Sequence, residues 1–146
     1  MANRVNSVDF AVYLRHKAIK RGFEPNVTQI QKWLYACYGI YFAINDKQIF
    51  DEEPRAWQYG PVFRNVYKQQ KSDGGLPEWV DDSRFSEHDD MLDVVFENLG
   101  GWTATKLVNW THKENGAWEK QWNRKRLEFM NNQEIKADFE RMFSGG

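Results

Sequence analysis

The stretch TQIQKWLYACYGIYFAI, residues 28–44, is the longest apolar segment of the chain and predicts the element around which the rest folds. The residues that recur at the three- and four-residue steps of one helix face are Ile30, Trp33, Leu34, Cys37, Ile40 and Tyr41. Because the flanking positions are also apolar, we expect a central helix over residues 28–44 that other helices bury on all sides. Its uncharged run, residues 33–45, is shorter than the ~20 residues that cross a bilayer, so no membrane span is expected.

Polar residues mark both ends of this predicted helix. Asn26 or Thr28 can cap its start with a side-chain oxygen, and Asn45–Asp46 predicts the turn that ends it. Gly39 lies in the middle, where glycine costs roughly 1 kcal/mol relative to alanine. We therefore expect another element to approach the helix backbone closely at Gly39.

Length and composition fit one domain over residues 1–146, since 41% of the residues are hydrophobic. The formal net charge of -1 lacks the positive excess that non-specific binding to DNA or RNA uses, so nucleic acid is not an expected partner. Cys37 is the single cysteine, which excludes an intrachain disulfide and a multi-cysteine metal site. The first residues contain no apolar signal segment, so we expect a cytoplasmic protein without metal or cofactor.

The rest of the chain predicts shorter helices, and with the central one they give a mainly α-helical bundle of about six helices. N-caps are expected at Ser7, Thr103 and Asn131. Ser86 and Asp89 have the S-x-x-D form of a capping box.

Residues 48–58 are the one region where the pattern permits sheet. Ile49–Phe50 and Ala56–Trp57 flank a polar bend that contains Pro54. This arrangement fits either a short β-ribbon or an extended loop.

A helix is expected after Gly60–Pro61, with Pro61 at its first position, where the missing N–H does no harm. Residues 72–75, SDGG, end that helix. The acidic linker that follows, which contains Trp79, is expected to be the most mobile segment.

The sequence has no glycine-rich phosphate loop, nucleophile elbow or HExxH pair, so no catalytic residue is predicted. One local cluster, Thr111–Glu114, places a histidine and a carboxylate where they could share a proton. A cation at a helix C-terminus explains His112 equally well. A small enzyme or ligand-binding domain that uses His112 and Glu114 therefore stays as an alternative.

Basic residues gather in two places, residues 15–21 and 124–126, which raises the alternative of a DNA-binding regulator. Such patches usually serve to solvate a surface. The near-neutral total charge also weighs against this alternative.

Several short motifs, each present once and in a fixed order, resemble those of a known protein family. They are KWLY at residues 32–35, FDE at 50–52, RAWQYGPV at 55–62, VY at 66–67 and LVNWTHKENGAW at 107–118. Their order and spacing resemble the Panacea domain family, the SocA-like antitoxins. The chain departs from the family pattern at Arg55, where an acidic residue is common, and at Gly116–Ala117, which replaces a proline.

The resemblance implies a small cytoplasmic protein, bacterial or from a prophage, that neutralises a protein toxin by direct contact and is not an enzyme. The SocA type is implied to hand its toxin to a cytoplasmic protease instead. The positions to which the resemblance gives a structural role are Lys32, Leu34, Tyr35, Trp57, Tyr59, Gly60, Pro61, Val62, Thr111, His112 and Trp118.

Aromatic residues and arginine dominate binding hot spots because they supply large contact areas. The residues that we predict to contact the partner are Trp57, Tyr59, Arg64, Tyr67 and Trp79. The expected partner is a toxin encoded by the neighbouring gene. A phage or prophage protein that binds a host factor is the alternative.

Overall fold

The computed structural model describes residues 4–78 and 81–143, which form seven α-helices and one two-stranded sheet. The helices are α1 (Ser7–Lys20), α2 (Val27–Asn45), α3 (Arg64–Gln70), α4 (Asp89–Leu99), α5 (Ala104–Thr111), α6 (Ala117–Arg124) and α7 (Asn132–Phe143). The strands are β1 (Arg55–Trp57) and β2 (Gly60–Val62), and two short 3-10 turns, Asp82–Arg84 and Ser86–His88, precede α4. The prediction of a mainly α-helical fold is confirmed.

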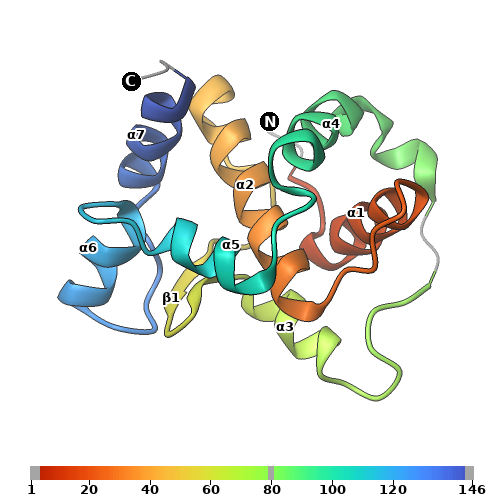
Figure 1. Cartoon of the computed structure of the whole chain (residues 1–146), viewed down its shortest axis with the longest axis horizontal. Coiled ribbons are helices and arrows are strands. Elements are labelled where there is room, and N and C mark those ends of the chain that lie inside the picture. Colours follow the sequence, from red (N-terminus) through yellow and green to blue (C-terminus); the bar gives the residue numbers. More distant parts are fainter. Residues whose placement is uncertain (1–3, 79–80, 144–146) are drawn as a thin grey trace.

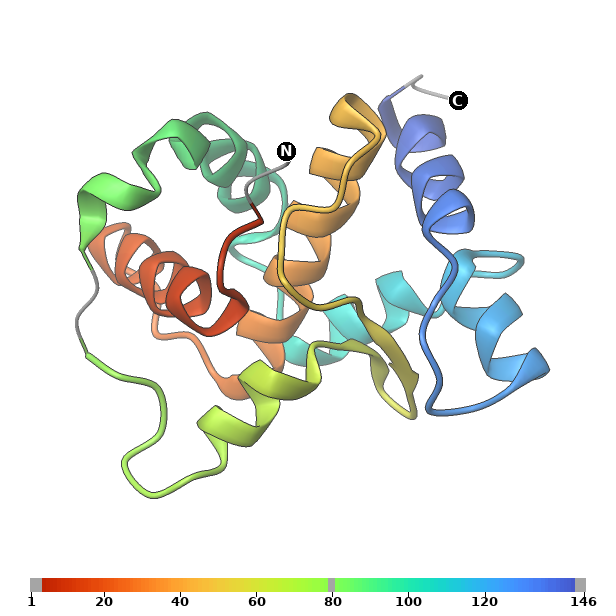
Figure 2. The ribbon, with the colours of Figure 1, turned by 180° about the vertical axis from the view of Figure 1, so that it is seen from behind.

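Helix α2 runs through the middle of the molecule, with α1 and α4 on one side and α7 on the other (Figures 1 and 2). It contacts α1, α3, α4, α5, α7 and β2, and every residue from 30 to 40 is buried. Asn26 caps its start in a capping box with Gln29, and Asp46 ends it in the left-handed conformation, at φ 56°. The central helix is therefore confirmed, although Ile44 at its end is 69% exposed rather than covered.

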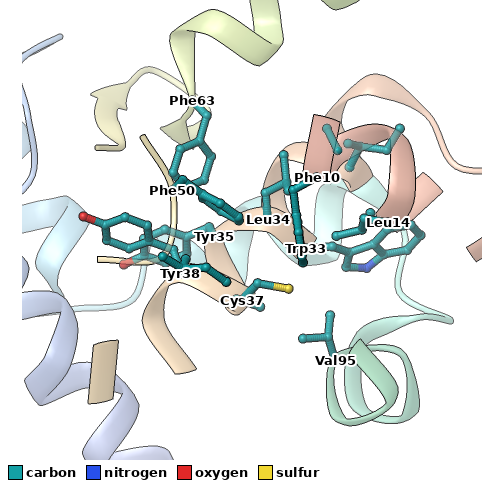
Figure 3. Packing of buried hydrophobic residues seen from close by; sticks show 14 of the residues in the cluster. Phe10, Leu14, Trp33, Leu34, Tyr35, Cys37, Tyr38, Phe50, Phe63 and Val95 are labelled. Atoms are coloured by element: carbon teal, nitrogen blue, oxygen red, sulfur yellow. The ribbon is translucent and has the colours of Figure 1, made fainter. Parts of the chain in front are cut away.

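The core consists largely of aromatic rings that meet at tilted and edge-to-face angles. Phe10, Phe50 and Phe63 form one such chain, with ring centroids 5.1 Å and 5.4 Å apart. Figure 3 shows Trp33 on the side of Leu14 and Val95, with Tyr35 and Tyr38 on the opposite side of α2. Cys37 is fully buried, and its burial raises the pKa of the thiol.

The predicted close approach at Gly39 is confirmed, and the approaching element is α7. A Cβ atom at Gly39 would overlap the ring of Phe139, which is itself buried. Helix α7 starts as predicted, because the Asn131 side chain accepts a hydrogen bond from the backbone N–H of Glu134 at 3.0 Å.

The short β-ribbon expected near residues 48–58 is present, and one strand lies in that range, but its partner is Gly60–Val62 rather than Ile49–Phe50. The predicted helix start at Pro61 is wrong. The strands pair antiparallel as Arg55 with Val62, Ala56 with Pro61 and Trp57 with Gly60, whereas Phe50 makes only an isolated bridge with Val5. Gly60 has a φ of 109°, which permits the tight turn and places Pro61 in β2, and α3 begins at Arg64 instead.

Two predicted caps are also wrong. Asn6 caps α1, while the N–H of Ser7 donates to Asp51 at 3.0 Å. Ser86 begins a 3-10 turn, and α4 starts only at Asp89, whose carboxylate accepts a bond from the Tyr13 hydroxyl. Thr103 caps α5 as predicted.

Candidate functional site

The β1–β2 hairpin is held in place by the segment that follows α6 (Figure 2). Ala56 donates its N–H to Glu128 at 2.9 Å and accepts the N–H of Leu127 at 2.8 Å. Met130 donates in turn to the carbonyl of Pro54 at 2.9 Å. Both edges of β1 are therefore paired, so the hairpin is a rigid part of the molecule rather than a free loop.

Lys32 of α2 attaches the hairpin to the central helix. Its side chain is 2% exposed, and Nζ donates to the carbonyl oxygen of Pro61 at 3.0 Å. Burial lowers the pKa of Lys32 from 10.5 to about 7. A Cβ atom at Gly60 would lie 2.5 Å from Oγ1 of Thr111, so the space between Lys32 and Thr111 admits only glycine. Four motif residues thus pack together at one point: Lys32, Gly60, Pro61 and Thr111.

Gln31 forms a second attachment, between α2 and the start of α3. Its side-chain oxygen accepts the backbone N–H of Phe63 at 2.8 Å, and its Nε2 donates to the carbonyl of the same residue at 3.2 Å. The amide pairs with Phe63 as a neighbouring strand would. Nε2 also contacts the side chain of Gln70 at 3.1 Å, which ties the far end of α3 to α2.

Trp118 holds the hairpin from the side of α6. Its Nε1 donates to the carbonyl oxygen of Trp57 at 2.8 Å. His112 stacks on its ring, with the centroids 3.7 Å apart and an interplanar angle of 17°. Trp122 stacks parallel to Trp118 at 5.2 Å.

His112 is placed for packing. Desolvation lowers its pKa, and the nearby Lys32 lowers it further. Its Nε2 is buried and has no hydrogen-bond partner within residues 4–78 and 81–143. Glu114 is exposed, and among the described side chains no hydrogen bond or ion pair joins it to His112. The proton-sharing pair of the enzyme alternative is therefore not assembled here.

Two hollows meet at Trp57 and Leu127, and we call them together the Trp57 groove. The first, of about 330 Å³, is lined by Val27, Thr28, Gln31, Lys32, Trp57, Gln58, Tyr59, Val62, Tyr67 and Leu127. The second, of about 350 Å³, is lined by Arg55, Trp57, Arg64 and Leu127. The groove thus runs from the start of α2 across the hairpin to the start of α3.

Four of the five predicted contact residues line this groove. Trp57 and Tyr67 are half-buried and meet edge to face, with ring centroids 5.2 Å apart, while Tyr59 is 65% exposed. Arg64 is exposed in the second hollow. The fifth, Trp79, lies outside the described residues.

Leu127 is a groove residue that the sequence did not single out. It has a φ of 68°, a left-handed conformation that is uncommon for a leucine, and its side chain is 56% exposed. Its hydrogen bond to Ala56 fixes this conformation. The pattern around it, a mixture of charged and apolar residues, gives no local signal for such a position.

No group of three or more His, Cys, Asp or Glu side chains within the described part of the chain could hold a metal ion. None of the described helices has the length and apolar character needed to cross a membrane.

The sequence model of the family described as antitoxin SocA-like, Panacea domain, matches residues 30–119. The matched range begins within α2 and includes the hairpin, α3, α4 and α5. It thus contains three of the aromatic residues of the groove, Trp57, Tyr59 and Tyr67. The comparisons with curated proteins and with solved structures found no match.

Proposed function

Because the chain belongs to the Panacea domain family of SocA-like antitoxins, we propose that it neutralises a protein toxin by direct contact through the Trp57 groove. Family membership supports an antitoxin-type, non-catalytic role with a protein partner. The toxin that we expect is the product of a neighbouring gene, and residues 1–146 act as one unit.

The observation that carries this proposal is the position of the groove within the family-matched range. Tyr59 projects from a hairpin that Lys32, Trp118 and the segment after α6 all hold in place. A rigid surface loses little conformational entropy on binding, so its exposed aromatic rings can contribute nearly their full contact area.

The test is growth rescue in bacteria that express the candidate toxin from an inducible promoter. Wild-type protein should restore growth, and Tyr59→Ala combined with Arg64→Ala should abolish rescue. Truncation of hot-spot residues costs about 2 kcal/mol or more, which corresponds to roughly a thirtyfold weaker complex. Failure of the wild-type protein to rescue growth from any neighbouring gene product would refute the proposal.

Ile44→Ala is the matched control variant. Ile44 is 69% exposed against 65% for Tyr59, but it lies at the opposite end of α2 from the groove. It should therefore keep full rescue. If Ile44→Ala loses rescue while the groove variant keeps it, the contact surface lies at that end of α2.

Direct contact can silence the toxin in two ways, by blocking its action or by delivering it to a cytoplasmic protease. If the protein blocks the toxin without removing it, the toxin level on an immunoblot should stay constant during rescue. A fall in the toxin level would instead support delivery to a cytoplasmic protease.

A further inference from the structure

We propose that the Trp57 groove takes an acidic segment of the protein partner, with an apolar side chain against Trp57 and Leu127 and carboxylates toward Arg55 and Arg64. This inference rests on the proposed function and specifies the chemistry of the toxin surface. It follows from the charges, the apolar contacts and the backbone geometry of the groove.

The charge of the groove differs from that of the whole chain. Its lining contains two arginines, Arg55 and Arg64, and no carboxylate, while the Lys32 amine is buried against the Pro61 carbonyl. Neither arginine forms an ion pair with another described residue, whereas the sequence as a whole carries 21 acidic and 20 basic residues. An unpaired cationic surface favours a partner of opposite charge, because complementary potentials raise the association rate and fix the orientation.

Three carboxylates near Arg55 and Arg64 accept hydrogen bonds from other groups of the chain. Beyond Arg55 and Arg64 lies a more polar hollow of about 420 Å³ whose lining includes Asp51, Glu52 and Glu53. Each of these accepts a hydrogen bond from another group: from the N–H of Ser7 at 3.0 Å, the N–H of Asn65 at 3.0 Å and the amide of Asn132 at 3.3 Å, respectively. None of the three carboxylates forms an ion pair with Arg55 or Arg64, so the N–H groups of both described guanidinium groups can donate to a carboxylate of the partner.

Arg55 is also oriented by an aromatic ring. Its guanidinium lies over Phe129, 4.2 Å from the ring centroid, and Phe129 is 45% exposed. A guanidinium that stacks on a ring through its face keeps its edge available, and the edge is where a carboxylate binds in a bidentate manner. Stacking thus holds Arg55 in a conformation suited to that contact.

Leu127 supplies the apolar half of the site. A leucine in the left-handed region is strained, and such strain persists where the surrounding structure imposes it, commonly at binding sites. Here the pairing of residues 127–130 with β1 imposes it and leaves the side chain 56% exposed between the two hollows. Its exposure gives an apolar side chain of the partner a surface to cover.

Another hollow, outside the Trp57 groove, differs from it in the charge of its lining residues. It lies between the end of α2 and α4, has a volume of about 370 Å³, and is lined by Glu87 and Asp90 with no lysine or arginine. An acidic segment would be repelled there. The selectivity that we propose therefore belongs to the Trp57 groove and not to apolar hollows in general.

The experiment uses the purified full chain and a phage-displayed library of random 12-residue peptides as the probe. Selection on the wild-type protein should enrich peptides in which Asp or Glu flanks a Leu, Phe, Tyr or Trp. A selected peptide should bind Arg55→Glu/Arg64→Glu roughly tenfold more weakly or worse by fluorescence anisotropy, and binding should weaken with added salt. Lys20→Glu/Lys47→Glu reverses two exposed lysines outside the groove lining and should bind as the wild type does.

Three results would overturn the inference: no enrichment of any peptide, enrichment without acidic residues, or equal binding by the Arg55→Glu/Arg64→Glu variant. A circular dichroism melt of each variant separates loss of binding from loss of fold. The growth assay distinguishes the two proposals: if Arg55→Glu/Arg64→Glu still rescues growth, this inference fails while the antitoxin function stands. If the wild-type protein rescues growth from no toxin, the function fails and the peptide selection alone decides the inference.

Discussion

Replacing Lys32 by methionine tests the energetics of the contact that attaches the hairpin to α2. The pKa of Lys32 is 10.5 when the lysine is exposed and about 7 when it is buried in the fold. Each pH unit of that difference corresponds to ~1.4 kcal/mol, so holding Lys32 protonated in the native state costs about 5 kcal/mol. Methionine fills a similar volume and carries no proton, so the variant lacks this cost.

The sign of the pH dependence follows from proton binding. Between pH 7 and 10.5 the unfolded wild-type chain binds a proton at Lys32 that the folded chain has lost. The free energy of unfolding of the wild type, relative to Lys32→Met, should therefore rise with pH across this window. Below pH 7 both states are protonated and the difference is constant. The expected rise between about pH 6.5 and 9.5 is about 3 kcal/mol.

The assay is urea unfolding of both proteins, followed by tryptophan fluorescence, at several pH values in that range. Groups that titrate equally in the two proteins cancel in the difference. Lys47→Met makes the same side-chain change at an exposed lysine and serves as the control for the substitution itself. If the difference for Lys32→Met stays constant within about 1 kcal/mol, the reasoning about the buried amine is wrong.

Two further predictions concern stability and use the same urea assay. Gly39→Ala should lower the free energy of unfolding by about 2 kcal/mol, because the overlap with Phe139 outweighs the gain in helix propensity, and it should cost nothing in a Phe139→Ala background. Asn131→Ala removes the cap bond to Glu134 and should cost about 1 kcal/mol, whereas Asn123→Ala, at an exposed asparagine, should change stability by less than ~0.5 kcal/mol.

Local patterns predicted α2 and the starts of α5 and α7 correctly. The helical period of the 28–44 stretch, the cap at Asn26 and the glycine at position 39 all depend on residues close in sequence. The motif-based resemblance is likewise confirmed, since the family match covers residues 30–119. Helical period, capping residues and glycine positions can be read from the sequence because the interactions that they indicate join residues close in the chain.

The hairpin could not be predicted in the same way. Its outer pairing joins Ala56 to Leu127 and Glu128, which lie far along the chain, and nothing near either segment specifies that register. The predictions of Ser7 and Ser86 as caps were also wrong, since Asn6 caps α1 and α4 starts only at Asp89. The Ser7 hydroxyl instead donates to Glu52, a partner distant in sequence.

The candidate site was foreseen in its aromatic residues and in Arg64, but not in Arg55 or Leu127. Trp57, Tyr59 and Tyr67 stood out because aromatic residues supply large contact areas at binding hot spots. Lys32 appeared in the sequence only as a motif residue, and nothing in the chain around it indicates that its amine is buried against the Pro61 carbonyl. Burial of a lysine depends on the elements that cover it, which the helix sequence alone does not contain.

The depth of Cys37 makes the protein a convenient background for thiol chemistry. Only the thiolate reacts with alkylating reagents, and a buried thiol with a raised pKa presents almost none of it. Alkylation of Cys37 should consequently proceed only when the packing around α2 opens, so its rate reports unfolding of the core. A Tyr59→Cys substitution could then carry a fluorophore at the hairpin tip while the native thiol stays silent, which would let contact with a partner and opening of the core be followed in one molecule.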